Sequence, residues 1–432
     1  MSDPTPSRAA DAVWLHVGTL IDGTSRTPSR DAHVVYDAEC IRFVGRDGRT
    51  PPREVLRPGQ DRPDVDAVAY TMLPGLIDAH AHLFLEGGEL NSDKRAAALE
   101  LPAAELLTRA QDRAERLVRI GAAAVRDAGD RHSVGLALSR RAACDAASSA
   151  NNLAPIPYIE SPGAAINHRG RYGGFMSEPA EACASPYDCV EARISAGADR
   201  IKLIATGIVD FVYPDRAPAA QMSRDEIAAF VAAAASFGRQ TFAHASGDEG
   251  IERVIVGGVD SVEHGYFVRD DQLARMADCG VAWVPTLAPV QRQIDHEATI
   301  GWSDVVVANL HRIIERHGRS LAAAHAMGVT IVAGSDAGSY GVRHGYGLLY
   351  ELELMERAGM SSLAVLNAAT GVGAARLGYK RKLGRIEPGF LSRFILTHHS
   401  PLDGVANLRK PRRVVFDGTV YDVAESEDET AL

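Results

Sequence analysis

The stretch Pro74–His82, PGLIDAHAH, decides the fold of this chain. A short apolar run ends in His80 and His82, which one small residue separates. In a β-strand, residues i and i+2 point to the same face, so we expect both imidazoles on one side of a buried strand. Two imidazoles held on a rigid strand would form half of the ligand shell of one metal ion.

Seven further strand-like runs follow along the chain, each with a loop and a helical pattern after it. Together with the first run, 73–82, they cover residues 121–129, 155–163, 198–207, 239–246, 259–266, 280–287 and 328–336. Nearly continuous apolar runs that alternate with helices indicate parallel strands covered on both faces. Eight such units predict an α/β fold, namely a (β/α)8 TIM-type barrel. The alternative, a doubly wound open sheet, should carry a glycine-rich phosphate turn after its first strand, where this chain has histidines.

The predicted helices have recognisable ends. Ser223 followed three residues later by Glu226 has the pattern of a capping box, ahead of an alanine-rich helix. Glycines are placed where helices stop before the next strand, at Gly121, Gly197, Gly280 and Gly328.

The two ends of the chain have a different pattern, with short strands and turns. We expect residues 11–70 and 383–423 to form one composite β-sandwich beside a hydrolase barrel over residues 71–382. Residues 1–10 are predicted to be a flexible N-terminus, and the acidic residues 424–432 a disordered tail.

Composition and charge restrict the class of protein. The chain has 432 residues, of which 46% are hydrophobic and 24% charged, as in an ordinary globular protein. A formal net charge of −10 argues against nucleic acid or an anionic membrane as a partner. No secretory signal and no run of roughly 20 apolar residues is visible, so we expect a cytoplasmic protein. Cys183 and Cys189 are close enough in sequence to suggest a local pair, but in that compartment they would stay reduced.

Candidate metal ligands lie on five predicted strands, all but one of them at the strand end. His80 and His82 end the first strand, and the others lie on strands four, five, six and eight: Lys202, His244, His264 and Asp336. In a barrel of this kind, chemistry collects at the carboxyl ends of the strands, so these side chains should meet at one mouth. Nitrogen and oxygen donors of this kind suit a borderline metal ion such as Zn²⁺.

Lys202 needs a separate argument because a protonated ammonium group cannot bind a metal ion. Only five of the 46 basic residues are lysines, yet one of them lies in the middle of a buried strand, IKLIATG. A lone buried lysine is costly in its charged form. A neutral lysine reacts with CO2 to give a carbamate, a carboxylate that can bridge two cations. The alternative is a lysine that reaches an ion pair at the surface.

With these residues in this order, the chain resembles the metal-dependent amidohydrolase superfamily. The resemblance covers nearly the whole chain and rests on PGLIDAHAH, GADRIKLIATG, TFAHA, DSVEHG and AGSDAG, in that order. LIDGT and LGRIEPG are similar to its split β-sandwich. HAH with a lysine on strand four resembles the binuclear branch, and more narrowly its prolidase-like, Xaa-Pro dipeptidase and carboxypeptidase members.

The resemblance implies a role for each candidate ligand. His80, His82 and Asp336 would bind the more buried metal ion, and His244 and His264 the second. Carboxylated Lys202 would bridge two divalent cations, Zn²⁺ being our expectation, and Asp336 would also carry the proton. A metal-bridged hydroxide would then attack the carbonyl of an amide or peptide bond.

The substrate is expected to carry a carboxylate. Cationic and aromatic side chains follow predicted strands three and eight, and the candidate substrate-binding residues are His168, Arg169, Arg171, Tyr172, Arg343 and His344. The planar fork of arginine suits a carboxylate, although surface ion pairs would explain these arginines equally well. A dipeptide or an N-acyl amino acid is therefore the first choice.

Two other functions remain open. A cyclic amidase or imidazolone-type hydrolase on the same scaffold would open a ring instead of cutting a chain. A catalytically dead relative acting as a binding protein would usually lack at least one ligand, whereas this set is complete. We expect a small-molecule substrate and a homo-oligomer.

Overall fold

The computed structural model describes residues 12–24, 26–145, 154–214, 218–379 and 382–424. The predicted flexible N-terminus lies outside these residues, as does the predicted acidic tail apart from Ala424. The chain divides into two compact units. Unit 1 comprises the described residues up to Ile77, Val118–Ala123 and those from Ser362 onward, and unit 2 comprises Asp78–Leu117 and Ala124–Ser361.

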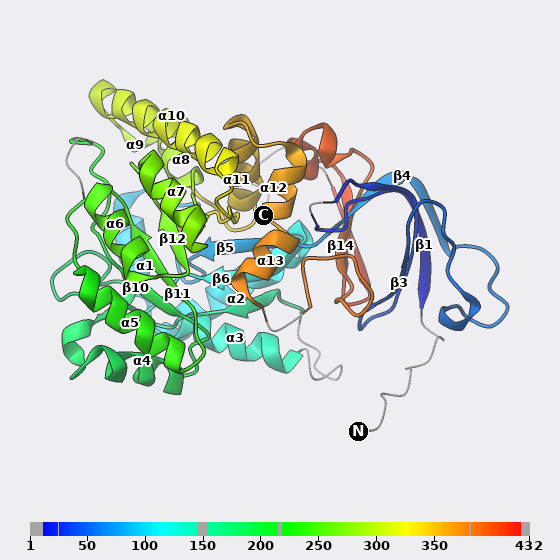
Figure 1. Cartoon of the computed structure of the whole chain (residues 1–432), viewed down its shortest axis with the longest axis horizontal. Helices are drawn as coiled ribbons and strands as arrows, with labels where there is room; N and C mark the ends of the chain where they lie inside the picture. Colours follow the sequence, from blue (N-terminus) through cyan, green and yellow to red (C-terminus); the bar gives the residue numbers. More distant parts are fainter. Residues whose placement is uncertain (1–11, 25, 146–153, 215–217, 380–381, 425–432) are drawn as a thin grey trace. The chain divides into compact units, whose positions relative to one another are not determined.

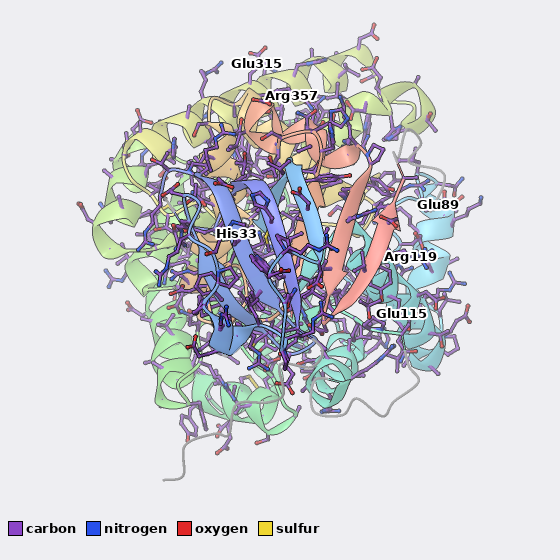
Figure 2. The ribbon with its side chains drawn as sticks, turned by 90° about the vertical axis from the view of Figure 1, so that its right-hand side faces the viewer. His33, Glu89, Glu115, Arg119, Glu315 and Arg357 are labelled. Atoms are coloured by element: carbon purple, nitrogen blue, oxygen red, sulfur yellow. A yellow bond between two sulfur atoms is a disulfide. The ribbon has the colours of Figure 1, made fainter. Side chains whose placement is uncertain are left out.

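Unit 1 is built around a mixed sheet that joins strands from both ends of the chain. Its hydrogen-bonded order is β16-β15-β14-β4-β1-β2-β3. The strands are β1 (Val13–Leu20), β2 (Ser29–Tyr36), β3 (Ile41–Gly45), β4 (Val65–Pro74), β14 (Arg393–Thr397), β15 (Arg412–Phe416) and β16 (Thr419–Val423). Figure 2 shows these strands side by side, with His33 among the blue N-terminal ones. The sandwich form of this sheet remains a prediction.

Burial alternates along β3 and through the middle of β1, whereas β14 is buried throughout and β2 over its last five residues. Leu15, Val17 and Val34 lie in one buried cluster, which Phe394 and Val415 from the C-terminal strands complete. The same unit contains two short helices and 3-10 turns, namely α12 (Ser362–Ala368), α13 (Gly371–Leu377), η2 (Arg53–Val55), η4 (Pro401–Asp403) and η5 (Val405–Arg409). Apolar contact between strands far apart in sequence therefore joins the two chain ends.

Unit 2 contains most of two smaller sheets. One has the order β5-β6-β7 and the other β13-β12-β11-β10-β8-β9. The strands are β5 (Leu76–Ala81), β6 (Ala122–Asp127), β7 (Tyr158–Glu160), β8 (Ala165–Asn167), β9 (Ser177–Pro179), β10 (Ile201–Ile204), β11 (Thr241–Ala245), β12 (Ser261–His264) and β13 (Ala282–Val284). The pairings of β6 with β7, and of β8 to β13 along their sheet, are parallel. The parallel α/β class predicted from sequence is thus confirmed.

The eighth predicted run differs from a regular strand. Ile331 forms only an isolated bridge with Trp283. The segment still connects two strands, because Val332 N donates to Trp283 O at 2.9 Å and Ala79 N donates to Ala333 O at 2.9 Å. The short β8 and β9 were not predicted, and β10 pairs with β8 and not with β7.

Helices follow most strands of unit 2 and pack on one another in sequence order, as the run from α4 to α7 in Figure 1 illustrates. Their bounds are α1 (Ser92–Leu99), α2 (Ala103–Ile120), α3 (Val134–Asp145), α4 (Pro186–Ser195), α5 (Arg224–Ser236), α6 (Asp248–Gly257), α7 (Asp270–Cys279), α8 (Ala288–Asp295), α9 (Glu297–Ile300), α10 (Asp304–Ala326) and α11 (Tyr346–Arg357), with η3 at Ala180–Ala182. No helix in the described ranges is long and apolar enough to cross a bilayer.

The sequence signals at helix ends are confirmed with one exception. Ser223 Oγ accepts from Glu226 N at 3.2 Å, as an N-cap should. The Glu226 carboxylate instead meets His168 Nε2 at 2.9 Å, because an ion pair attracts it away from the helix terminus. Gly280 caps α7 in the left-handed conformation, at φ 67°.

Cys183 and Cys189 form a disulfide at the start of α4. The expectation that they stay reduced is therefore wrong for this structure. Their Cα atoms are 5.4 Å apart, which is within the range that a disulfide needs.

We expect Gly371→Ala to destabilise unit 1. A Cβ atom at this position, the first residue of α13, would overlap the backbone carbonyl of Gly23, so the backbone would have to shift. The free energy of unfolding should fall by about 1–3 kcal/mol, a typical cost of overpacking. Calorimetric melting measures it. Gly174→Ala is the control because no atom lies within 4 Å of its added Cβ. Equal melting temperatures for both variants would contradict the packing of α13.

Candidate active site

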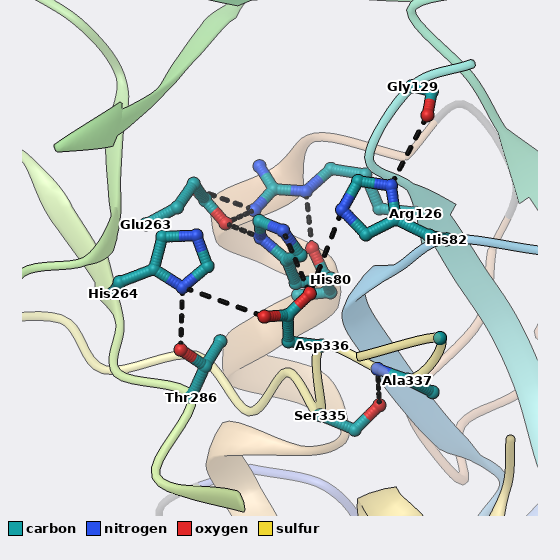
Figure 3. Close-up of polar contacts among 12 residues, drawn as sticks. His80, His82, Arg126, Gly129, Glu263, His264, Thr286, Ser335, Asp336 and Ala337 are labelled. Atoms are coloured by element: carbon teal, nitrogen blue, oxygen red, sulfur yellow. Dashed lines mark hydrogen bonds and ion pairs between the residues drawn. The ribbon is translucent and has the colours of Figure 1, made fainter. Parts of the chain in front are cut away.

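Three predicted ligands meet at the end of β5. His80, His82 and Asp336 each offer one ligand atom, and these atoms all lie within 4.8 Å of one another. Asp336 Oδ1 is 3.8 Å from His80 Nε2 and 3.7 Å from His82 Nε2. Figure 3 shows both imidazoles pointing toward the Asp336 carboxylate. Two nitrogens and a carboxylate oxygen are a donor set that Zn²⁺ prefers.

A buried ion pair fixes the tautomer of His80. Glu263 Oε2 lies 2.6 Å from His80 Nδ1 and 2.8 Å from Arg126 Nη2. Because a carboxylate accepts hydrogen bonds, His80 Nδ1 carries the proton and Nε2 keeps its lone pair. His80 Nε2 is buried and has no hydrogen-bond partner among the described residues. An orphaned lone pair facing a second imidazole and a carboxylate fits a bound cation.

His82 is oriented in the same way. The carbonyl oxygen of Gly129 lies 3.2 Å from His82 Nδ1, so Nδ1 is the donor. That contact leaves His82 Nε2 for a ligand, and it is this atom that faces Asp336. His80 and His82 therefore both present Nε2 to the site. In each ring an acceptor bound to Nδ1 holds this orientation.

His264 reaches the site through an unusual backbone. Its φ of 67° is left-handed, and it follows Glu263 directly. In an extended strand these neighbours would point to opposite faces. Here Glu263 contacts His80 while His264 Nδ1 lies 3.9 Å from Asp336 Oδ2 and 2.8 Å from Thr286 Oγ1.

His244 and Lys202 complete the set of predicted ligands. The ring centroids of His244 and His264 are 4.6 Å apart, and His244 Nε2 lies 3.2 Å from Gly207 O. Lys202 is 1% exposed, with its Nζ 4.7 Å from the centroid of the Phe242 ring. Burial lowers the pKa of Lys202 to about 8, which increases the fraction of neutral amine near neutral pH.

Burial keeps the imidazoles neutral. Burial and the nearby Lys202 lower the pKa of His82 to about 3 and that of His244 to about 4. The pKa values of His80 and His264 fall well below the usual 6.5 for the same leading cause. Burial also raises the pKa of Asp336 to about 7. Neutral imidazoles have the lone pairs that metal binding requires.

A cavity of about 590 Å³ opens above these groups. All six predicted ligands line it, and its remaining wall is mainly apolar. Its size falls in the range of small-molecule sites, where a few polar groups fix a ligand against apolar walls.

Tyr172 is the one predicted substrate-binding residue that lines this cavity. Its ring centroid is 5.2 Å from that of His244. His168 is held instead between Glu181 and Glu226, with N–O distances of 2.8 and 2.9 Å. His344 Nε2 lies 3.0 Å from Leu85 O. Arg169, Arg171 and Arg343 do not line the cavity either, and their roles remain predictions.

The sequence reading assigned no role to three residues that support the ligands: Arg126, Glu263 and Thr286. Glu263 lies inside the quoted motif DSVEHG, one residue before His264, and Arg126 lies in the predicted strand 121–129. A charged residue on an otherwise apolar strand was the available signal. Thr286 gave none, because its contact with His264 depends on the turn after β13.

A second cluster, in unit 1, is a poorer metal site. His16, Asp31 and His33 also come close together. Trp14 Nε1 donates to His33 Nδ1 at 3.1 Å, so His33 Nε2 carries the proton and has no lone pair to offer. Both ring nitrogens of His16 are already occupied by carboxylates, with Nε2 2.6 Å from Asp31 Oδ1 and Nδ1 3.2 Å from Asp66 Oδ1.

Comparison with known proteins agrees with this geometry. A family model described as the amidohydrolase family matches residues 71–421. Ochratoxinase of Aspergillus niger is 25% identical over 436 residues, covering 94% of this chain and 85% of its own. A crystal structure of a Xaa-Pro dipeptidase with bound methionine has a TM-score of 0.78 at 25% identity, covering 96% of this chain and 100% of its own. A prolidase complexed with N-methylphosphonate-L-proline shares the fold, with a TM-score of 0.75 at 23% identity, 95% of this chain and 99% of its own.

A buried carboxyl group supports the loop that carries Thr286. Glu351, on α11, accepts from Leu287 N at 2.9 Å and from Ala288 N at 2.7 Å. Burial raises the pKa of Glu351 from 4.5 to about 8. Between these values the unfolded chain binds fewer protons than the folded one, so this group makes stability fall as pH rises.

We therefore expect Glu351→Gln to flatten the pH dependence of stability. The wild type should lose up to about 1.4 kcal/mol per pH unit through this group as the pH rises from 4.5 toward 8. The variant should be less stable at low pH, where glutamine offers one acceptor for two N–H groups, and the difference should narrow at high pH. Urea unfolding across this range measures it, with the exposed Glu100→Gln as control. Parallel curves would contradict the assignment.

Proposed function

We propose, since this chain belongs to the amidohydrolase family and is a hydrolase of amide bonds, that its site is a binuclear metal centre. The orphaned Nε2 of His80, which faces His82 and Asp336 below the cavity, carries this proposal. His80, His82 and Asp336 would hold the first divalent cation, and His244 and His264 the second. Carboxylated Lys202 would bridge them, and Zn²⁺ fits the donor set.

The substrate we propose is a dipeptide or an N-acyl amino acid with a free carboxylate. The likeness to a Xaa-Pro dipeptidase and to ochratoxinase supports amide hydrolysis. The cavity of about 590 Å³ suits a molecule of dipeptide size.

The chain's own residues supply binding, orientation and proton transfer. Asp336 would take a proton from the attacking water and return it to the leaving nitrogen. Glu263 and Arg126 keep His80 in one tautomer, and Thr286 orients His264. The apolar wall excludes bulk water, which strengthens each polar contact at the scissile bond. Divalent cations, when bound, would polarise the carbonyl and lower the pKa of water toward about 7.

We also propose that unit 2 closes as a (β/α)8 barrel. Hydrogen bonds in both directions between residues 330–336 and their neighbours, β13 on one side and β5 on the other, support closure at that point. Asp199 N donates to Ser161 O at 2.9 Å, which links the start of β10 to the end of β7.

Metal content is the first test of the binuclear site. Protein purified without chelator should contain about two equivalents of Zn²⁺ or a similar ion per chain. Removal of the metal should abolish hydrolysis of N-acyl amino acids, and added Zn²⁺ should restore it. Lys202→Ala should lower the content because the bridge is lost, whereas the exposed Lys94→Ala should not. If the wild type contained one equivalent of metal and Lys202→Ala contained the same, the proposal that Lys202 bridges two cations would be contradicted.

Asp336→Asn tests the proton shuttle. Asparagine keeps a carbonyl oxygen near the first cation but cannot accept the proton from water. Metal content should be largely retained while kcat falls by about 10²–10⁴-fold. The matched control is Asp278→Asn, an exposed aspartate on α7. A kcat close to that of wild type in Asp336→Asn would exclude this role.

A further inference from the structure

The cavity contains a cation that is not among the substrate-binding residues predicted from the sequence. Arg95, on α1, is the one arginine among the described residues that line it. The arginines predicted to bind substrate lie elsewhere, so a carboxylate that entered this cavity would meet Arg95 or Lys202. In our proposed site Lys202 is already committed as the bridging ligand.

Backbone carbonyls hold the Arg95 guanidinium rigidly. Nη1 donates to Glu86 O at 2.6 Å and to Glu89 O at 3.4 Å, and Nη2 donates to Gly338 O at 2.8 Å. Its plane also lies over the Tyr340 ring, with Cζ 4.8 Å from the centroid. A guanidinium has five N–H donors, so these three bonds leave donors for a ligand.

Arg95 makes no direct ion pair with a described residue, although the charges of Glu86, Glu89 and Asp336 act on it at longer range. Across the residues that the structure describes, no carboxylate lies within ion-pair distance of it. Two acidic residues whose backbone carbonyls contact Arg95 pair with other cations through their side chains: Glu86 with Arg113 at 2.6 Å and Glu89 with Lys94 at 3.7 Å. A partly buried cation bound only to neutral carbonyls is electrostatically incomplete, and an anionic ligand would complete it.

Arg95 is also close to the reacting groups. Arg95 donates to the carbonyl of Gly338, which is two residues from Asp336 in sequence. Ser339 and Tyr340, which follow Gly338, line the cavity together with Arg95. A carboxylate bound at Arg95 would therefore lie in the same cavity as the reacting groups, against the segment that carries Asp336. The rest of the wall suits an apolar substituent and includes Phe84, Phe175, Ile208, Phe211, Val290 and Trp302.

We propose that Arg95 is the specificity-determining residue that binds the substrate carboxylate. The substrate is then an N-acyl amino acid or dipeptide whose apolar side chain packs on the aromatic wall. This inference rests on the proposed function and deepens it by naming the residue that reads the carboxylate. The arginines after strands three and eight are then not needed for recognition.

The test compares acids with their neutral amides. Release of acetate is measured from a panel of N-acetyl amino acids with apolar side chains, such as N-acetyl-L-phenylalanine, and from the matching carboxamides. Wild type, Arg95→Gln, Arg95→Lys and the control Arg109→Gln are compared, and the metal content of each is measured. Arg109 is exposed on α2 and pairs with Glu105.

Arg95→Gln should lower kcat/KM for the acids by about thirtyfold or more, chiefly through KM, and should leave the amides nearly unchanged. For Arg95→Lys, kcat/KM for the acids should lie between those of wild type and Arg95→Gln, because lysine keeps the positive charge but cannot form the two parallel hydrogen bonds of a guanidinium. Metal content should stay at the wild-type value in all variants, and Arg109→Gln should behave as wild type.

The remaining outcomes separate two failures. An equal loss on acids and amides in Arg95→Gln would overturn the inference and make Arg95 a structural tie between the segments that contain Glu86 and Gly338. The proposed function would then stand, provided that wild type still prefers acids. A wild type that hydrolyses acids and amides equally would overturn carboxylate recognition itself, and with it the inference. A wild type that cleaves neither would overturn the proposed substrate class.

Discussion

The ion pair between Glu263 and Arg126 is the contact on which the site depends. It is fully buried, and it joins β12 to β6 while Arg126 Nε also donates to Ala79 O of β5 at 2.6 Å. A buried pair is costly to desolvate, and loss of either partner would leave the other charge uncompensated. Because Glu263 uses the same carboxylate to accept from His80 Nδ1, the pair also determines which nitrogen His80 presents to the cavity (Figure 3).

Strained backbone accompanies the ligands. His264, Thr286 and Asp336 all have positive φ, at 67°, 49° and 53°. Such conformations cost about 1–3 kcal/mol each for non-glycine residues and persist only where surrounding contacts enforce them. The contacts are present here. Tyr266 Oη donates to Thr286 O at 2.7 Å, and Asp336 N donates to His80 O at 2.7 Å. These strained conformations reduce the stability of the fold, and they direct the side chains of the site toward one point.

The cavity divides its chemistry by region. Imidazoles, Lys202 and Asp336 form a polar floor, whereas aromatic and aliphatic side chains form the wall. Low polarity above the floor strengthens the interactions of the charged groups below and favours substrates with apolar substituents. Arg95 is the one arginine among the described residues of a wall that also includes Glu86 and Gln293, and its lack of a direct ion pair is the reason to connect it with a ligand.

The sequence by itself determined the parallel α/β class, the family and the residues that reach the cavity floor. Those signals are local: His80 and His82 on one strand face, His244 and Asp336 at strand ends, and Lys202 within an apolar strand. Strand periodicity and the position of a strand end are properties of short segments, so they can be read without the fold.

Only the tertiary structure decided which cation faces the cavity and what holds the ligands. Charge composition suggested the loops after strands three and eight, but His168 is occupied by Glu181 and Glu226, and Arg95 comes from α1. The pairing of Glu263 with Arg126 joins residues 137 positions apart, and Thr286 meets His264 through a turn. Long-range contacts of this kind depend on register and on loop conformation, which no local pattern records.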